Sequence, residues 1–311
     1  MPELPEVETI RRHLERHVVG RTIASVWTSG LALRRPVPRT FAAALAGRSI
    51  AGVGRHGKFL ILALDDGARL VAHLGMTGKF LLRSPEIATD SKPAHTHAEL
   101  RFADGASLLF VDPRRFGLLD FRPVGSQDNG LGAPGGGVDP VAERLDGERL
   151  RALFRRCRGP IKHVLLDQRR IAGIGNIYAC EILFRAAIAP RRLVHTLKPD
   201  ERERLAGEIH DVLGRAIENR GTTFSDFRDL DDRPGDYAVA LQVYDREGEA
   251  CLRCGTTIRR IVQTGRSTFW CPGCQKREVR KVAGNSAGLN GRNGSAPPRA
   301  TSRRQRNRRA P

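Results

Sequence analysis

Two cysteine pairs near the C-terminal end constrain the fold of this chain more than any other feature. The pairs Cys251/Cys254 and Cys271/Cys274 each have C-x-x-C spacing, and 16 residues lie between them. Each pair can supply two thiolates from one tight turn, and zinc takes four ligands at the corners of a tetrahedron. Two unrelated pairs of core thiols are the alternative, which the polar segment between them disfavours. The spacing therefore predicts one structural zinc ion (Zn2+) held by all four cysteines.

Apolar residues between the two pairs are typical of a β-hairpin, with Arg266 near its tip. The other two cysteines, Cys157 and Cys180, lack partner spacing, and we expect them to be buried thiols. A zinc finger is often only a structural staple, so this module does not by itself indicate contact with DNA.

The charge of the chain indicates a polyanionic partner. The sequence has 53 Lys and Arg against 34 Asp and Glu, a formal net charge of +19. Residues 280–311 hold nine of these basic residues and no acidic one, so about +10 remains on the rest of the chain. Nucleic acid is the commonest partner for such an excess, although a membrane surface or an RNA–protein assembly would also satisfy it.

Neither a membrane span nor a secretory signal is expected. No apolar run approaches the roughly 20 residues that cross a bilayer, and the N-terminus is acidic where a signal peptide would be basic and then apolar. We therefore predict a cytoplasmic location. Disulfides are rare there, which agrees with cysteines used as metal ligands or buried thiols.

The pattern of apolar residues changes along the chain. Helical spacing after Pro5 predicts a helix that Gly20 ends, and residues 22–122 contain short strand-like runs separated by turns. These runs indicate a β-sandwich or barrel. The predicted fold class is α+β multidomain, divided as follows: the N-terminal helix and β-domain at 2–124, a linker at 125–140, a helical domain at 141–242, the finger at 243–276 and a disordered basic tail at 284–311.

The N-terminus itself could carry chemistry. Removal of Met1 would expose the secondary amine of Pro2, and an α-amino group titrates near pH 8, so a useful fraction is nucleophilic at neutral pH. Glu3 could transfer protons beside it, and Glu6 lies in the same turn. Most Met-Pro-Glu starts have no such role, and Pro5 with Glu6 also satisfies ordinary helix N-terminus preferences.

Five separated motifs settle how this start is interpreted. They are Met1–Thr9 (MPELPEVET), His73–Gly78 (HLGMTG), Asp112–Gly117 (DPRRFG), Gly173–Ala179 (GIGNIYA) and the cysteine module. Together and in this order they resemble the bacterial formamidopyrimidine-DNA glycosylases, also called 8-oxoguanine DNA glycosylases, over residues 2 to about 276. The resemblance implies an N-terminal β-sandwich, a helix–two-turns–helix domain and a zinc finger.

The resemblance also implies catalytic roles. Pro2 would be the nucleophile that forms a Schiff base, Glu3 the general acid, and Lys58 a strand lysine near the reacting sugar. Arg266 would hold phosphate from the finger. By position alone, Lys58 would be interpreted as a solvated lysine at a strand edge.

Further residues resemble the DNA contacts of the family. Such an enzyme must turn the damaged nucleotide out of the duplex and fill the space it leaves. Met76, Arg114 and Phe116 resemble the void-filling residues, although Met76 and Phe116 alone would be assigned to the core. The remaining predicted contacts are His73, His95, Arg115, Lys162 and Asn176. His95 with His97 could indicate a metal site, but two histidines make only a weak one.

We therefore expect a monomeric, nucleoid-associated bacterial enzyme of base-excision repair that acts on double-stranded DNA. It would remove oxidised purines and cut the strand at abasic sites by β,δ-elimination, with residues 221–237 covering the extruded base. Leu4 favours this branch over endonuclease VIII, which has glycine there and prefers oxidised pyrimidines. The alternative is a non-catalytic protein that only senses damaged DNA.

Overall fold

The computed structural model describes residues 1–87, 91–126, 136–222 and 235–276. The predicted tail at 284–311, most of the predicted linker and the middle of the predicted base-covering loop lie outside these residues.

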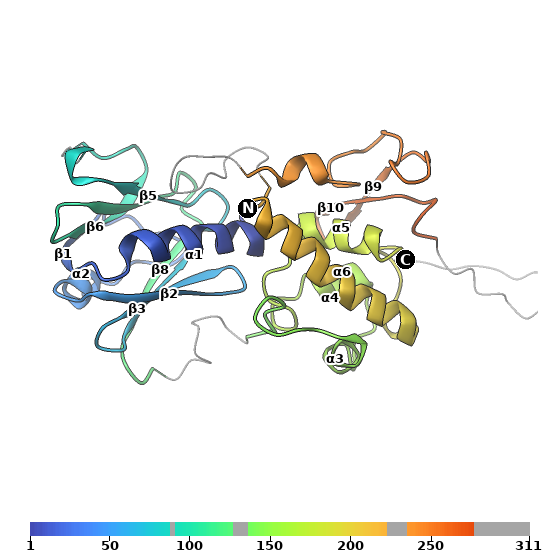
Figure 1. Ribbon diagram of the computed structural model, residues 1–311, viewed down its shortest axis with the longest axis horizontal. Coiled ribbons are helices and arrows are strands. Elements are labelled where there is room, and N and C mark those ends of the chain that lie inside the picture. The colour runs from blue at the N-terminus through green and yellow to red at the C-terminus, as the bar shows by residue number, and fades with distance from the viewer. Residues whose placement is uncertain (88–90, 127–135, 223–234, 277–311) are drawn as a thin grey trace, which may run out of the picture. The chain divides into compact units, whose positions relative to one another are not determined.

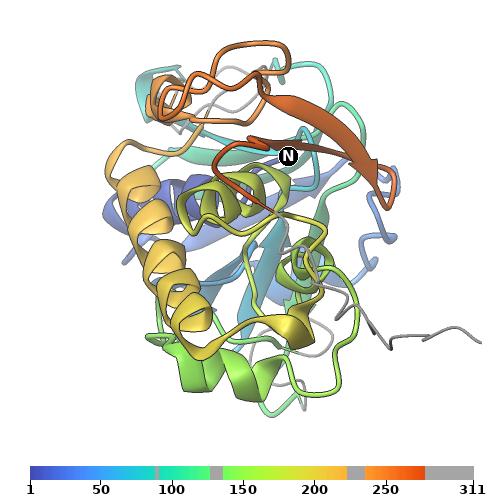
Figure 2. The same cartoon turned by 90° about the vertical axis from the view of Figure 1, so that its right-hand side faces the viewer.

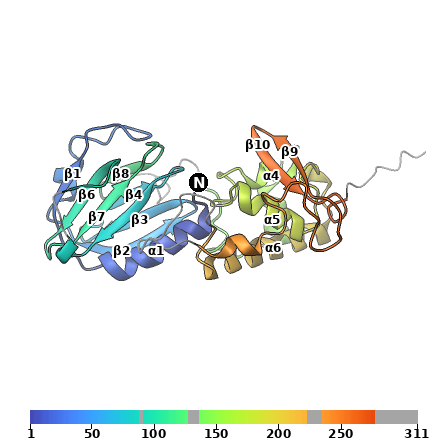
Figure 3. The ribbon, with the colours of Figure 1, turned by 90° about the horizontal axis from the view of Figure 1, so that it is seen from above.

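Two four-stranded antiparallel sheets form the N-terminal part (Figures 1 and 3). One sheet has the order β1-β6-β7-β5 and the other the order β2-β3-β4-β8. The strands are β1 (Ile23–Thr28), β2 (Ile50–His56), β3 (Phe59–Leu64), β4 (Arg69–His73), β5 (Lys79–Arg83), β6 (Thr96–Phe102), β7 (Ser107–Val111) and β8 (Leu118–Arg122). A short helix α2 (Phe41–Leu45) and the 3-10 turn η1 (Pro85–Ile87) lie in the connections. The predicted sandwich is confirmed.

Helix α1 (Leu4–Val18) runs along this sandwich and packs on β2 and β3 (Figure 1). Val7, Ile10 and Leu14 recur at helical spacing and are buried in the same core as the strands. The chain leaves the helix through Gly20, whose φ of +82° lies in the left-handed region that glycine adopts without strain.

Four helices build the second core. They are α3 (Gly147–Leu153), α4 (Ile161–Leu165), α5 (Asn176–Arg185) and α6 (Pro199–Glu218), with 3-10 turns η2 (Val194–Thr196) and η3 (Tyr237–Ala240). Leu4, the first residue of α1, is buried in this core, although the next apolar residues of α1 belong to the sandwich. The N-terminal end of α1 therefore lies where the two cores meet, as Figure 1 shows.

The finger consists of the hairpin β9 (Arg259–Gln263) and β10 (Arg266–Trp270). One cysteine pair precedes β9 in the sequence and the other follows β10. Strand β10 packs against α5, as can be followed in Figure 2. Phe269 of the hairpin and Phe184 of α5 share a small buried cluster with Cys180. Within the described ranges, no helix has both the length and the apolar character needed to cross a membrane.

Candidate active site

The Glu3 carboxylate is held at the N-terminal end of α5. It accepts backbone N–H bonds from Gly175 (2.7 Å), Ile177 (3.0 Å) and Tyr178 (3.4 Å), and the residue is only 2% exposed. The free N–H groups and the dipole of a helix start both favour a negative charge at this place. Gly175 is required there, because a Cβ on it would lie 2.2 Å from Glu3 Cδ. Pro2, the residue before Glu3, is buried as well.

Glu6 lies one turn further along α1 and is buried as well. Its carboxylate accepts bonds from the Glu3 backbone N–H (2.7 Å), the Tyr178 hydroxyl (2.5 Å) and the Thr222 backbone N–H (2.7 Å). Burial and the neighbouring Glu3 charge raise the pKa of Glu6, and the three donors oppose that shift. Glu6 therefore ties the N-terminus both to α5 and to the residue at which the base-covering loop was predicted to begin.

Lys58 lies in the turn between β2 and β3. Its Nζ donates to the carbonyl oxygen of Ile174 (3.1 Å), and the residue is 7% exposed. Burial lowers the pKa of Lys58, the charge of Arg266 lowers it further, and the carboxylates of Glu3 and Glu6 raise it. The finger arginine, the two N-terminal carboxylates and the turn lysine thus share one electrostatic environment.

A buried ion-pair network holds the Lys58 turn in place. Asp139 accepts from Arg55 Nη1 (2.5 Å) and Nη2 (3.2 Å) and from the Gly57 backbone N–H (2.7 Å). Arg55 Nε also donates to Glu8 of α1 (2.9 Å). Gly57 has a φ of +55°, and a Cβ there would lie 2.9 Å from the Cβ of Ala172. Asp139, at the end of the predicted linker, therefore fixes the turn against both α1 and the helical part.

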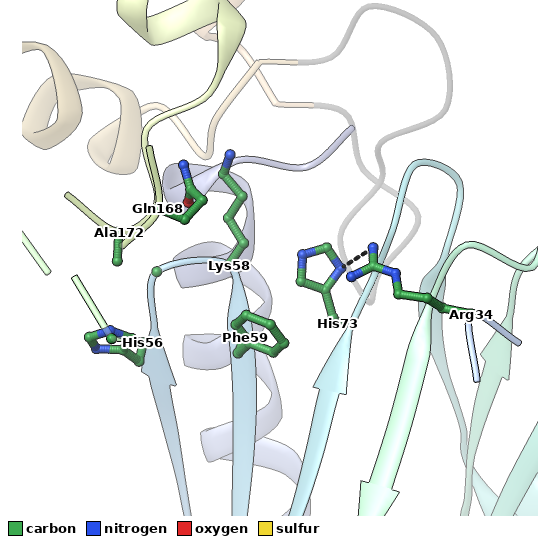
Figure 4. Close-up of a pocket in the computed structure, with 9 residues that line it drawn as sticks. Arg34, His56, Lys58, Phe59, His73, Gln168 and Ala172 are labelled. Atoms are coloured by element: carbon green, nitrogen blue, oxygen red, sulfur yellow. Dashed lines mark hydrogen bonds between the residues drawn. The ribbon is translucent and has the colours of Figure 1, made fainter. Parts of the chain in front are cut away.

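A cavity of about 210 Å³ is lined by Lys58 and by His73, the last residue of β4. Figure 4 shows Lys58 and His73 at neighbouring strand ends, with Arg34 directed at the imidazole. Burial, followed by the charges of Arg34 and Lys58, lowers the pKa of His73 to about 3. The ring is therefore neutral at pH 7. Its Nδ1 accepts the Gly75 backbone N–H (2.9 Å), so Nε2 carries the proton and can donate to an anion.

Lys162 is placed differently from the other predicted DNA contacts. It is 1% exposed, and its Nζ donates to Asn176 Oδ1 (2.7 Å), Thr268 Oγ1 (2.7 Å) and the Ser267 carbonyl oxygen (3.1 Å). These bonds use all three donors of the ammonium group. Asn176 also donates to the Ser267 carbonyl oxygen (2.9 Å). Lys162 therefore joins α4, α5 and the hairpin, and its placement does not fit a direct DNA contact.

The residues expected to fill the void are exposed on two loops. Met76 is 40% exposed and Phe116 is 45% exposed, so the core assignment that position alone would give does not hold. The guanidinium carbon of Arg114 lies 4.9 Å from the centroid of the Phe116 ring. Arg115 and His95 are also exposed and adopt left-handed backbone conformations, with φ of +56° and +64°.

The four predicted zinc ligands converge. Their Sγ atoms all lie within 4.8 Å of one another, with Cys251 to Cys274 at 3.9 Å and Cys254 to Cys271 at 3.5 Å. A tetrahedral site with Zn–S bonds of about 2.3 Å places its sulfur atoms about 3.8 Å apart. The residues therefore fit one structural zinc ion, which would hold the two ends of the hairpin together.

Family models match the chain in three segments. The formamidopyrimidine-DNA glycosylase N-terminal domain matches residues 1–119, and the H2TH domain of the same enzymes matches residues 137–228. The zinc finger found in FPG and IleRS matches residues 248–277. The formamidopyrimidine-DNA glycosylase of Brucella ovis is 41% identical over 292 residues, covering 88% of this chain and all of the relative. The chain belongs to the formamidopyrimidine-DNA glycosylase family.

Solved structures of this family have the same fold. The MutM (FPG) protein from Thermus thermophilus is 41% identical, with a TM-score of 0.77 over 88% of this chain and 98% of that one. A MutM protein solved in complex with DNA containing carbocyclic 8-oxo-G is 34% identical, with a TM-score of 0.80 over 89% of this chain and all of that one.

Sequence reasoning missed the residues of the glycosylase fold that hold the predicted site together. Arg34, Arg55 and Asp139 act through contacts with residues far away in the sequence, which no local pattern indicates. Tyr178 and Asp112 lie inside quoted motifs, where an aromatic hydroxyl and a carboxylate among apolar neighbours were the available signals. Cys180 is buried as expected, whereas Cys157 is only half-buried.

Proposed function

We propose that this chain excises oxidised purines, 8-oxoguanine and formamidopyrimidines, from double-stranded DNA and then cuts the strand as an AP lyase. One observation carries the proposal. The buried start of the chain, with Glu3 anchored on the N-terminus of α5, lies in the electrostatic range of Lys58 and, through it, of Arg266.

The proposed chemistry begins with removal of Met1, which turns the Pro2 nitrogen from an amide into a secondary amine. This nitrogen bonds to C1′ of the extruded nucleotide as the bond from C1′ to the damaged base breaks and the base leaves with a proton. Opening of the sugar ring gives a cationic iminium, which acts as an electron sink. Loss of a C2′ proton then expels the 3′ phosphate, and a second elimination expels the 5′ phosphate.

The surrounding groups supply protons and charge in this scheme. Glu3 donates a proton to the sugar ring oxygen, and the N–H groups of α5 stabilise the carboxylate that results. In this scheme Lys58, whose pKa burial lowers, and Arg266 act on the departing phosphates. Glu6 positions the backbone that carries Pro2 and Glu3. Zinc takes no part beyond shaping the finger.

The DNA side of the proposal uses the two exposed loops. Met76, Arg114 and Phe116 enter the duplex, and His73, His95, Arg115 and Asn176 lie along the phosphate backbone. The MutM relative solved with DNA containing carbocyclic 8-oxo-G supports this lesion class. We also propose that the enzyme acts as a monomer at the nucleoid, with the domain bounds 2–124, 141–242 and 243–276 given above.

Borohydride trapping tests the nucleophile directly. The full chain, checked by intact mass for loss of Met1, should form a reduced covalent adduct with a duplex containing 8-oxoguanine. Pro2→Gly should trap far less, and Pro199→Gly, which changes an exposed proline at the start of α6, should trap like the parent. Equal trapping by Pro2→Gly and the parent would refute the assignment of Pro2.

The same assays separate the catalytic proposal from a damage-sensing protein that lacks activity. A mature protein that retains Met1 would favour the sensor. Nicking compared on 8-oxoguanine and on an oxidised pyrimidine then decides the lesion class.

A further inference from the structure

The two loops that carry the exposed wedge residues are neighbours because of the strand order. The first loop joins β4 to β5 and carries Met76, and the second joins β7 to β8 and carries Arg114 and Phe116. Each loop passes from one sheet of the sandwich to the other. Strand β5 pairs with β7 and β4 pairs with β8, so both ends of one loop lie beside an end of the other.

A single hydroxyl and a single carboxylate connect these loops. Thr77 Oγ1 donates to Asp112 Oδ1 (2.6 Å) and accepts the backbone N–H of Arg114 (3.3 Å). The other oxygen of Asp112 accepts the backbone N–H of Gly117 (2.7 Å). Thr77 directly follows Met76, and the pair binds the backbone at Arg114 and at Gly117, the two ends of the second loop.

The connection is partly buried although the residues it serves are exposed. Asp112 is fully buried (0% exposed), and its carbonyl oxygen lies 3.1 Å from the Nε2 of His97. The loop backbones touch, since a Cβ on Gly75 would lie 2.5 Å from the carbonyl carbon of Phe116. On the far side, Arg34 Nε donates to the Phe116 carbonyl oxygen (3.0 Å).

We propose that Thr77 and Asp112 are positioning residues that lock the Met76 loop and the Phe116 loop into one rigid wedge. The inference rests on the proposed function, in which these loops enter the duplex. A wedge must keep its parts in fixed register while it replaces an extruded nucleotide. Strand pairing brings the ends of the two loops together, and the Thr77–Asp112 bond adds a side-chain connection between the loops themselves. A partly buried bond to a carboxylate is short and directional, which suits this task.

Thr77→Val removes the hydroxyl and keeps the branched shape, and Thr77→Ser keeps the hydroxyl as the matched control. We expect the single-turnover rate of 8-oxoguanine excision from a duplex to fall about tenfold in Thr77→Val, the loss typical of one bond to a charged group. The fluorescence rise of 2-aminopurine placed opposite the lesion should fall in parallel. Thr77→Ser should restore both signals.

A single-stranded substrate, which has no duplex gap to fill, distinguishes a positioning role of Thr77 from a general loss of protein stability. On a single-stranded oligonucleotide with an abasic site there is no partner base to hold, so Thr77→Val should trap with borohydride at the parent rate. An equal loss on this substrate, or a melting temperature below that of the assay, would show a merely structural role and overturn the inference. Parent-like excision and fluorescence in Thr77→Val would overturn it too. A parent protein that forms no adduct on any substrate would overturn the proposed function itself, and the inference with it.

Discussion

Replacing Asp139 with asparagine removes one charge from the network that fixes the Lys58 turn and changes little else in shape. Asp139 is 2% exposed and accepts from Arg55 and from the backbone N–H groups of Gly57 and Val141. Burial would raise the pKa of Asp139, but the bonds and charge of Arg55, followed by the backbone donors, outweigh it and leave the pKa below its usual value. The folded protein therefore holds this group as an anion.

The cost of Asp139→Asn can be worked from these contacts. Breaking a buried ion pair by removing one partner costs about 3–5 kcal/mol, because the other charge is left uncompensated. Here Glu8 still lies 2.9 Å from Arg55 Nε, and asparagine still accepts from part of the donors. We therefore expect a loss of about 2–3 kcal/mol. For a protein of this size that is a fall in melting temperature of about 4–6 °C.

Thermal unfolding followed by circular dichroism measures this loss. Asp211→Asn makes the same chemical change at an exposed position of α6 and should leave the melting temperature unchanged. Because the Lys58 turn loses its brace, Asp139→Asn should also slow strand cleavage at a temperature where the variant is folded. A melting temperature equal to that of Asp211→Asn would refute the argument that the network is structural.

Three further outcomes follow from the site. Gly175→Ala puts a Cβ 2.2 Å from Glu3 Cδ, so 8-oxoguanine excision should fall at least about 100-fold as the acid is displaced, whereas Gly214→Ala, with open space around it, should excise like the parent in the same gel assay. The folded pKa of His73 is about 3 against 6.5 in the unfolded chain, so below pH 6.5 the unfolded state binds a proton that the folded state does not. The free energy of unfolding in urea should therefore drop by about 1.4 kcal/mol per pH unit between pH 6 and 4 from this residue, and His73→Gln should show a shallower slope; an unchanged slope would contradict the neutral imidazole. Blocking the thiols should release one zinc ion per chain in a colorimetric assay, and Cys251→Ser should abolish DNA binding while the sandwich still melts cooperatively; a value other than one would contradict the four-cysteine site.

Local patterns in the sequence predicted the parts of this molecule that depend on local physics. The apolar spacing of Val7, Ile10 and Leu14 predicted α1, and the two cysteine pairs predicted a converged zinc site. Motif resemblance went further and named Glu3, Lys58 and Arg266, which belong to three distant segments. The spacing of residues could not have brought those three together, because nothing in a local window encodes how the segments are arranged in space.

The residues that sequence reasoning missed are those whose role depends on long-range contacts. Arg55 reaches Asp139 across 84 positions and Glu8 across 47 positions, and such pairs leave no local signal. Lys162 shows the reverse case. Its predicted DNA contact rested on motif resemblance, but Thr268 and Ser267, 106 and 105 positions away, accept hydrogen bonds from its Nζ inside the protein.

Long-range contacts also explain how the N-terminus becomes a defined site. A free chain end gains little from ordering, because fixing each residue costs about 1–2 kcal/mol of backbone entropy. In this chain Leu4 is buried in the helical core, Glu3 accepts from the start of α5, and Glu6 accepts from the Tyr178 hydroxyl and the Thr222 N–H. These contacts with the helical part offset the entropy cost of ordering the N-terminus. The apolar residues that follow in α1 pack in the core of the sandwich. Because both sides must be folded before Pro2 has a fixed position, we conclude that the proposed nucleophile is built by the packing of the two cores, and that weakening either one should cost activity before it costs fold.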